Sequence, residues 1–281
     1  MIHLVLLFGL CFGSPLSKEL GSKLIFGGSL APRKLFPFQV LIRTVDPDGG
    51  SYMCGGTILN SRFVLTAAHC VPVIEINGST TVYAGILDQE NLSAFGAQSS
   101  RVSAIIKHSE HNVGVAKSND VAILKLTSEF KWSDSVRPIK IYADDSFADT
   151  SDGQEAYVVG FGDYKFVNGS AMDSRYLRYV KLATVNRNTC REDWIKQNIT
   201  ITGTQICAGG GTKGKGVGQG DSGGPLLVRT GKGSKTEWRQ IGVSSFIDFY
   251  DKTVKCPDVF TRTASYCEFM AKATENTFHC L

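Results

Sequence analysis

A serine enclosed by glycines is the feature of this chain that most plainly indicates chemistry. Residues 219–225 read Gln-Gly-Asp-Ser-Gly-Gly-Pro, with Ser222 as the serine. Glycines leave space around a turn, so the Ser222 hydroxyl can be exposed while the backbone N–H groups of Gly220 and Ser222 face one point. An exposed hydroxyl beside two convergent N–H groups is the arrangement that acyl transfer requires.

A serine hydroxyl is a weak nucleophile, so this interpretation requires a histidine as base and a carboxylate to hold it. Both occur beside apolar runs: residues 66–70 read Thr-Ala-Ala-His-Cys, and residues 119–126 read Asn-Asp-Val-Ala-Ile-Leu-Lys-Leu. His69 could instead be a packed core histidine, and Asp120 a turn or capping residue. Because both motifs accompany the serine motif, we favour a catalytic role for each. Three other histidines lie in polar contexts and are predicted to be surface residues: His108, His111 and His279.

The order His69, Asp120, Ser222 resembles that of the chymotrypsin-like serine peptidases, and the resemblance extends from residue 25 to about residue 273. It implies that Ser222 attacks the substrate carbonyl, that His69 carries the proton and that Asp120 orients the imidazole. The N–H groups of Gly220 and Ser222 would form the oxyanion hole. The resemblance thus implies a serine endopeptidase that works through an acyl-enzyme. The alternative is a binding or signalling protein that keeps this fold without catalysis, which the three retained residues disfavour.

Short apolar or alternating runs separated by Gly, Asn, Asp and Ser fill residues 38–126, and they are typical of antiparallel strands. Similar runs continue in the second half, and closed barrels would hide the strand edges. We therefore expect an all-β fold. The resemblance implies two antiparallel six-stranded Greek-key β-barrels, over about 25–135 and about 140–262, in a peptidase domain of residues 25–281. Residues 264–274 lack Gly and Pro and predict one C-terminal helix.

The first residues of the chain predict export. Residues 2–12 form an apolar run that is too short to span a bilayer and stands where a secretory signal belongs. We expect a signal peptide over residues 1–13, with cleavage near Gly13, and a propeptide over residues 14–24. The mature protein would then be secreted and extracellular.

Residues 25–28, Ile-Phe-Gly-Gly, are similar to the activation sequence of the same family. In that family a freshly cut α-amino group, here that of Ile25, pairs with the aspartate before the serine, here Asp221. A buried carboxylate without a cation is costly, so only the cut chain would be active. Leu24 stands where Lys or Arg is usual, and Lys23 precedes it. Activation would take either a cut after Leu24 by an enzyme that prefers apolar residues, or a cut after Lys23 followed by removal of Leu24.

The resemblance also places the pocket for the side chain of the scissile residue. Gly216 stands at the floor where trypsin has an aspartate, while Asp258 aligns with a pocket wall and can bring a carboxylate near that floor. Ile247 stands where trypsin and chymotrypsin have glycine, and it should narrow the entrance, since overpacking costs about 1–3 kcal/mol or more. We predict a preference for small or medium side chains, or broad cleavage, with some tolerance of basic ones. The residues expected to bind substrate are Gly216, Val217, Gln219, Ser245, Phe246, Ile247 and Asp258; Ser245 would also hydrogen-bond to Asp120.

Seven of the eight cysteines remain once Cys11 leaves with the signal peptide, and an exported chain would pair most of them. The resemblance implies two disulfides, Cys54–Cys70 and Cys190–Cys207. The pairing of Cys256, Cys267 and Cys280 stays open, with Cys256 either a free thiol or in an unusual pair. The spacing does not fit zinc ligands, and Ile86 stands where calcium-binding relatives have an acid. We therefore predict no metal and no cofactor.

Composition excludes several classes of partner. A chain of 281 residues with 42% hydrophobic content can bury one large core or two modest ones. The net charge of +4 is small and the cations are dispersed, so neither nucleic acid nor a membrane surface is an expected partner. The expected partners are protein or peptide substrates, an activating protease and protein inhibitors, and the chain should be a monomer.

Four sequons are candidate glycosylation sites in an exported chain: Asn77, Asn91, Asn168 and Asn198.

Overall fold

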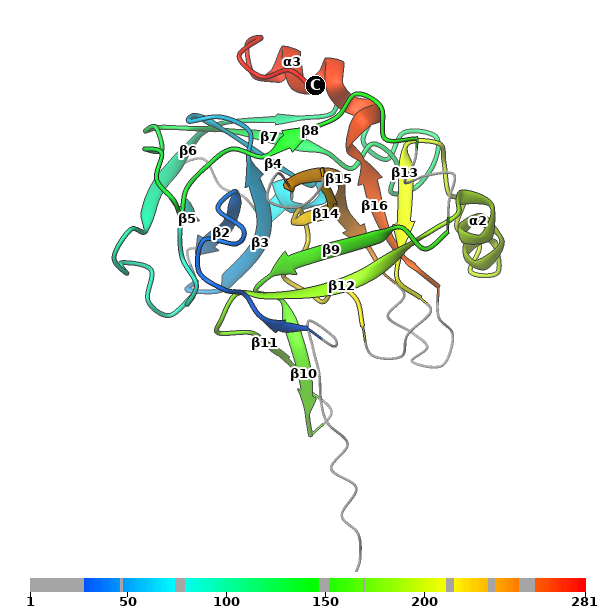
Figure 1. Cartoon of the computed structure of the whole chain (residues 1–281), viewed down its shortest axis with the longest axis horizontal. Helices are drawn as coiled ribbons and strands as arrows, with labels where there is room; N and C mark the ends of the chain where they lie inside the picture. Colours follow the sequence, from blue (N-terminus) through cyan, green and yellow to red (C-terminus); the bar gives the residue numbers. More distant parts are fainter. Residues whose placement is uncertain are drawn as a thin grey trace, which may run out of the picture.

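The computed structural model describes residues 28–45, 48–73, 79–146, 152–168, 170–210, 215–231, 236–247 and 256–281. The predicted signal peptide, the propeptide, Ile25 and Asn77 lie outside these residues. The described part forms two β-barrels, seen on the left and on the right of Figure 1, with the C-terminal helix at the top.

The first barrel is a closed ring of six antiparallel strands in the order β2-β3-β4-β7-β6-β5. Its strands are β2 (Gln39–Val45), β3 (Ser51–Ile58), β4 (Phe63–Thr66), β5 (Thr80–Ala84), β6 (Gln98–Lys107) and β7 (Ala122–Leu126). Strand β5 has the pattern that barrel strands require. Its side chains alternate between buried and half-buried along all five residues. One face of each such strand packs into the barrel core and the other faces outward.

The second barrel closes in the order β9-β12-β13-β16-β15-β14, because β12 pairs with β9. Its strands are β9 (Glu155–Gly160), β12 (Arg178–Val185), β13 (Gln205–Ala208), β14 (Pro225–Thr230), β15 (Glu237–Phe246) and β16 (Asp258–Arg262). All six are paired antiparallel. Two closed six-stranded antiparallel barrels confirm the fold class predicted from the sequence.

Four further strands of the described part lie outside the two rings. Strand β8 (Lys140–Ile141) runs parallel to β15, and β10 (Asp163–Val167) and β11 (Ser170–Asp173) form a hairpin at the bottom of Figure 1. Strand β1 (Ser29–Leu30) pairs with β12 of the second barrel. Residues 29–30 fall in the stretch that we assigned to the first barrel from the sequence, so the described part of the chain starts on the second barrel and then crosses to the first.

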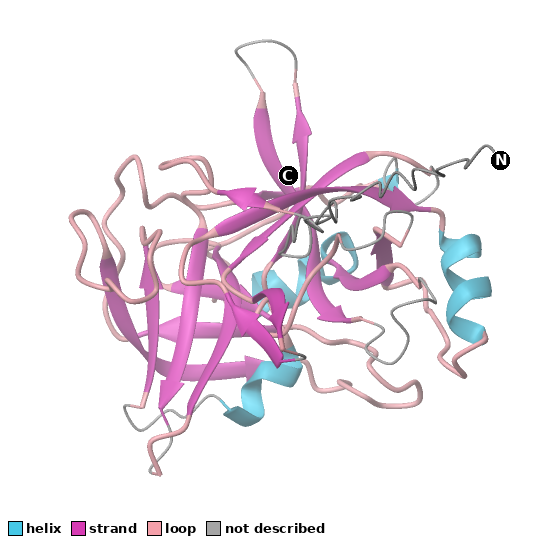
Figure 2. Cartoon of the chain, turned by 90° about the horizontal axis from the view of Figure 1, so that it is seen from below, coloured by secondary structure: helices cyan, strands magenta, loops and turns pink. Residues whose placement is uncertain are grey.

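Helices are few in the part of the chain that is described (Figure 2). The predicted C-terminal helix is present as a 3-10 turn, η3 (Thr263–Tyr266), followed by α3 (Cys267–Ala273). A second helix, α2 (Arg187–Ile195), was not predicted from the sequence. It is capped by the Asn186 side chain, which accepts a hydrogen bond from the N–H of Asn188, and it buries Cys190 and Trp194 one turn apart.

Among the described residues, three disulfides tie loops to these elements. Cys54–Cys70 and Cys190–Cys207 are paired as expected, and Cys267–Cys280 is the third pair. Each closes a short loop, which stabilises a folded chain by about 3 kcal/mol. Cys256 keeps its thiol, which is buried and lies 3.6 Å from the carbonyl oxygen of Asp193.

Hydrogen bonds between the barrels hold the residues of interest. The N–H of Gly55 on β3 donates to the carbonyl of Ser222 at 2.7 Å, and Thr261 Oγ1 on β16 donates to the carbonyl of Asp120 at 2.8 Å. A buried bond of 2.7 Å from Thr57 Oγ1 to Gln240 Oε1 joins the same two barrels. Ser222 and Asp120 are therefore positioned by the barrel to which they do not belong.

Candidate active site

Two neighbouring strands of the first barrel bring His69 and Asp120 together. Strand β4 ends at Thr66 and β7 begins at Ala122, and these two residues are partners in the antiparallel register. His69 follows β4 in the 3-10 helix η1 (Ala68–Val73), and Asp120 stands just before β7. Antiparallel pairing places the end of one strand beside the start of the next, so two residues distant in sequence come into contact.

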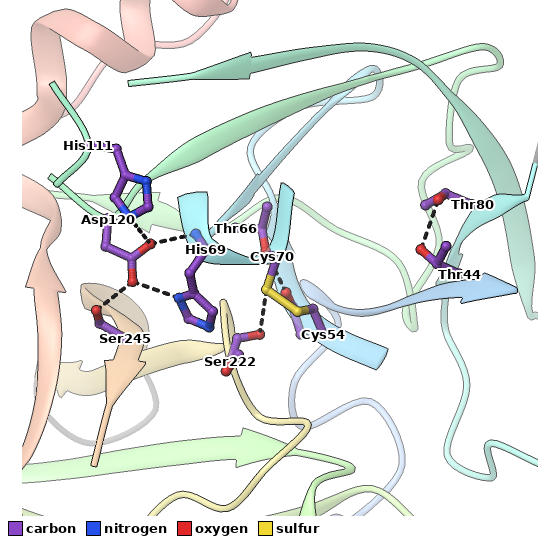
Figure 3. The surroundings of a disulfide bond; sticks show 11 residues. Thr44, Cys54, Thr66, His69, Cys70, Thr80, His111, Asp120, Ser222 and Ser245 are labelled. Carbon is purple, nitrogen blue, oxygen red and sulfur yellow. Dashed lines mark hydrogen bonds and ion pairs between the residues drawn. A yellow bond between two sulfur atoms is a disulfide. The ribbon is translucent and has the colours of Figure 1, made fainter. Parts of the chain in front are cut away.

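The Asp120 carboxylate is buried and accepts hydrogen bonds at both oxygens (Figure 3). Oδ1 accepts from the backbone N–H of His69 at 2.8 Å, and Oδ2 accepts from His69 Nδ1 at 2.7 Å and from Ser245 Oγ at 2.5 Å. Burial alone would raise the pKa of Asp120, but the hydrogen bonds from His69 and Ser245 outweigh it and hold that pKa below its ordinary value. An ionised carboxylate on Nδ1 fixes the proton there, which leaves Nε2 of His69 able to accept another proton.

Glycines around Ser222 let its loop approach the first barrel. Gly220 and Gly223 have φ of 89° and 79°, in the left-handed region that favours glycine. A Cβ on Gly223 would lie 2.2 Å from Thr66 Oγ1 and 2.6 Å from the carbonyl oxygen of Gly55, so a larger residue cannot fit there. The loop is thereby held against the strands that carry the histidine.

The backbone N–H groups of Gly220 and Ser222 differ from their neighbours in having no acceptor among the described residues. The N–H of Asp221 donates to Gly218 at 3.2 Å, and that of Gly223 donates to Ser244 at 2.9 Å. Gly220 and Ser222 also line a pocket. Two donors left unused at a pocket wall are what a developing oxyanion requires.

One pocket of about 450 Å³ brings the three sequence motifs together. His69, Asp120 and Ser222 all contribute to its wall, together with Gly220. The His69 side chain is 36% exposed, so its ring is accessible from the pocket. The Ser222 hydroxyl makes no hydrogen bond to any described residue. The hydrogen bond between a catalytic serine and its histidine is often long in the absence of substrate and shortens when substrate binds.

Five of the seven residues predicted to bind substrate line this pocket: Val217, Gln219, Ser245, Phe246 and Ile247. Gly216 and Asp258 are not among the described residues of its wall. Asp258 lies behind the wall, where its Oδ2 accepts from the N–H of Val217 at 2.9 Å. A Cβ on Gly216 would come within 2.5 Å of the same oxygen. Asp258 as a whole is half-buried, but protein atoms surround its carboxyl group. This burial raises the pKa of Asp258 to about 7.

Asp221 is a second buried carboxyl group, only 2% exposed. Its Oδ1 accepts from the N–H of Gly162 at 2.8 Å and its Oδ2 from the N–H of Gly218 at 2.9 Å. Burial outweighs both bonds and raises the pKa of Asp221 to about 7. None of the described residues offers it a cation within ion-pair distance. Ile25, which we expected to supply one, lies outside the described part of the chain.

Two ionisable residues of the pocket wall, His111 and Lys117, were not predicted from the sequence. His111, predicted to be on the surface, has a side chain only 11% exposed, and its Nε2 lies 3.6 Å from Asp120 Oδ1, so that prediction was wrong. Burial lowers the pKa of His111, against the attraction of Asp120. Lys117 places its ammonium 4.4 Å from the centre of the Phe246 ring. Both belong to the loop that leads into Asp120, and this closeness in sequence was the signal available.

The other two histidines differ from each other. His108 is half-buried and its ring packs against those of Tyr266 and Phe269, at 5.4 and 5.0 Å between ring centres, so it too is not a simple surface residue. His279 is exposed, as predicted.

Three sequon asparagines are exposed residues: Asn91, Asn168 and Asn198.

Within the described ranges, no group of three or more His, Cys, Asp or Glu side chains is placed to hold a metal ion. Ile86, the residue whose apolar side chain argued against calcium binding in the sequence, is buried. No described helix is both long and apolar enough to cross a membrane.

Comparison with known proteins agrees with this geometry. The family model described as Trypsin matches residues 25–270. The chain is 31% identical over 264 residues to the proclotting enzyme of Tachypleus tridentatus, over 88% of this chain and 65% of that protein. It is 31% identical over 251 residues to Chymotrypsin-2 of Vespa crabro, over 88% of this chain and 99% of that protein. It is also 27% identical over 288 residues to the phenoloxidase-activating enzyme of Bombyx mori, over 95% of this chain and 64% of that protein.

The chain spans about two thirds of the length of the proclotting and phenoloxidase-activating enzymes, and nearly the whole of the chymotrypsin. The family model covers most of the chain, including both barrels and all three residues that meet at the pocket. This chain belongs to the trypsin family.

Proposed function

We propose that this protein is a secreted serine endopeptidase, made as a zymogen, which hydrolyses peptide bonds through an acyl-enzyme on Ser222. The observation that carries the proposal is the His69–Asp120 pair, bonded at 2.7 Å, in the wall of the pocket that also contains Ser222. A histidine that is held by an ionised carboxylate and shares a pocket with a serine is the combination that activates a hydroxyl.

The proposed reaction has two halves. Ser222 Oγ attacks the scissile carbonyl while its proton passes to His69 Nε2, and the negative oxygen is received by the N–H groups of Gly220 and Ser222. His69 then gives its proton to the leaving amine, which breaks the peptide bond and leaves an ester on Ser222. Water deprotonated by His69 cleaves that ester and restores the hydroxyl. Asp120 stays ionised throughout, as its lowered pKa favours, and stabilises the charged imidazole.

Activation would follow a cut that makes Ile25 the first residue. Asp221 supports this step, because its carboxyl group is buried and protonated more readily than usual, with a pKa of about 7. A cation placed beside it would favour the ionised form and compensate for its lost hydration. The cut falls either after Leu24, or after Lys23 with later removal of Leu24.

The primary pocket would accept small or medium side chains, or cleave broadly. Ile247 lines the pocket with a branched side chain, which supports a narrow entrance. Asp258 would act indirectly, because it accepts a bond from Val217, a residue of the pocket wall. Gly216 leaves room for this carboxyl group, since a Cβ there would collide with it.

Secretion is supported by the three disulfides, which persist in oxidising compartments. The exposed sequons Asn91, Asn168 and Asn198 would carry glycans in that setting. The partners of a secreted monomeric zymogen would be protein or peptide substrates, an activating protease and protein inhibitors.

The test is labelling of the activated protein with a fluorophosphonate, followed by cleavage of a peptide library. To fix the cut, residues 20–24 are replaced by an enteropeptidase recognition sequence, so that digestion exposes Ile25. The activated chain should be labelled and should cleave the library, whereas its Ser222→Ala variant should do neither. A folded, cut chain that remains unlabelled would show a catalytically silent member of the family, acting by binding alone.

A further inference from the structure

Lys117 lies in the pocket but has no part in the proposed reaction. Its ammonium is 4.4 Å from the centre of the Phe246 ring, and both residues line the pocket that contains Ser222. Phe246 precedes Ile247, the residue proposed to narrow the entrance for the scissile side chain. Lys117 is therefore next to the position that the acyl part of a substrate would occupy.

The backbone of Lys117 is held from two sides. Its N–H donates to Asn112 Oδ1 at 2.6 Å, within the same loop, and its carbonyl accepts from Gln205 Nε2 at 3.2 Å, on β13 of the second barrel. Its φ of 63° lies in the left-handed region, which residues other than glycine adopt rarely. Such a conformation persists only where its surroundings impose it, so the position of this lysine is determined by the fold.

The aromatic ring under the ammonium is also fixed. Phe246 is only 7% exposed, and Trp194 of α2 meets it edge-on at 5.1 Å between ring centres. Trp194 in turn donates from Nε1 to the carbonyl of Pro257 at 2.9 Å. The face of an aromatic ring attracts a cation, so this anchored ring gives the ammonium a preferred place.

The charge of Lys117 is incompletely balanced. The residue is exposed to solvent overall, but neighbouring atoms of the pocket remove part of the hydration of its ammonium, which lowers the pKa of Lys117 against the attraction of Asp120. No carboxylate among the described residues forms an ion pair with it, whereas Lys125 and Lys140 each have a glutamate partner. A partly desolvated cation without such a partner gains by receiving an anion.

We propose that Lys117 makes the cleft select protein substrates that carry an aspartate or glutamate a short distance before the scissile bond. The substrate carboxylate would pair with the Lys117 ammonium above the Phe246 ring, and so supply the missing counter-charge. This inference rests on the proposed peptidase function and adds the chemistry of a second recognised side chain.

The experiment uses the chain activated at Ile25 and peptides in matched pairs. Each pair differs by Asp against Asn at one of the three positions before the scissile residue. At low salt, kcat/KM for the Asp peptide should exceed that for the Asn peptide by about three- to tenfold at one position, as for a partly desolvated ion pair. The ratio should decrease towards one as salt is added, because salt screens the pair.

Substitutions assign the preference to its residue. Lys117→Met keeps a long apolar stem and should bring the ratio to about one, while Lys117→Glu should reverse it and favour Lys over Asp at the same position. Lys107→Met is the matched control, because Lys107 is an exposed neighbouring cation outside the pocket wall, and that variant should keep the preference. Near-ultraviolet circular dichroism checks that each variant folds.

Two results would overturn the inference while leaving the peptidase proposal intact. One is a wild-type enzyme that cleaves both members of every pair equally, and the other is a Lys117→Met variant that keeps the acidic preference. A cut wild-type chain that neither cleaves nor is labelled would contradict the peptidase proposal, and this inference with it.

Discussion

His111 and His69 lie against different oxygens of one carboxylate: His111 Nε2 is 3.6 Å from Asp120 Oδ1, and His69 Nδ1 is 2.7 Å from Asp120 Oδ2. The two imidazoles are not equivalent. His69 forms a hydrogen bond to its oxygen, whereas the His111 ring only approaches its oxygen and is largely shielded from solvent, beside Lys107, His108 and His69. Its lowered pKa keeps His111 neutral at pH 7.

This difference predicts how stability changes with pH. The unfolded chain protonates His111 near pH 6.5, while the folded chain resists until a lower pH, so the contribution of His111 to the free energy of unfolding should decrease as pH falls below 6.5. His111→Gln should weaken this decrease and leave stability at pH 7 nearly unchanged. Urea unfolding at pH 7 and pH 5, in a Ser222→Ala background, measures it. His279→Gln is the control at an exposed histidine. Equal pH slopes for all three proteins would contradict the prediction.

Removing the hydroxyl of Ser245 should impair catalysis more than folding. Its Oγ donates to Asp120 Oδ2 at 2.5 Å, and a hydrogen bond to a charged group contributes about 1.5–3 kcal/mol. Ser245→Ala should therefore reduce kcat/KM by about ten- to a hundredfold on peptide substrates. Ser244→Ala removes the neighbouring hydroxyl, which forms no bond to Asp120, and should have a smaller effect. Equal losses in the two variants would argue against a positioning role for Ser245.

The raised pKa of Asp221 predicts that the cut before Ile25 stabilises the folded protein, by an amount that depends on pH. In the absence of a cation, the folded carboxyl group has a pKa of about 7, against 3.8 when unfolded. The contribution of this carboxyl group to the stability of the uncut chain should thus be greatest below pH 4 and decrease up to pH 7, by at most about 4 kcal/mol. The α-amino group of Ile25 would remove this loss. The difference in Tm between cut and uncut chain should therefore be small at pH 4 and of order 5 °C at pH 7.

A chain cut one residue earlier provides the control for this experiment. It begins at Leu24, so its α-amino group is displaced from Asp221 by one residue. It should behave like the uncut chain in both thermal unfolding and fluorophosphonate labelling. If it gains stability and activity equal to those of the chain that begins at Ile25, the proposed ion pair with Asp221 is wrong.

The side chain of Ile247 should decide how large a residue the primary pocket accepts. Ile247→Gly removes a branched side chain from the pocket wall, so the ratio of kcat/KM for Phe against Ala at the scissile position should rise by about tenfold or more. Ile247→Val, which stays branched and loses one methylene, should change the ratio little. A wild-type enzyme that already prefers Phe, Tyr or Arg at that position would refute the expectation of a narrow entrance.

Much of the architecture could be predicted from local patterns. Short apolar runs between turn residues, such as Phe63–Thr66, indicated strands, and that segment forms β4 with all four residues buried. The motifs around His69, Asp120 and Ser222 indicated residues that the fold brings to one pocket, because each motif has its own chemical signature. Helix α2 was missed because only nine residues form it, and a buried Cys190 and Trp194 are too few to reveal a period.

The sequence by itself determined an all-β fold and the chemistry of the serine motif, and its family resemblance implied the disulfide partners of Cys54 and Cys190. Tertiary structure alone decided that Cys267 pairs with Cys280, that β1 joins the second barrel, and that His111 and Lys117 enter the pocket. The physical reason is that these outcomes depend on contacts between distant segments. The loop of Lys117 is held by Gln205, 88 residues away, and no pattern within the loop records that bond.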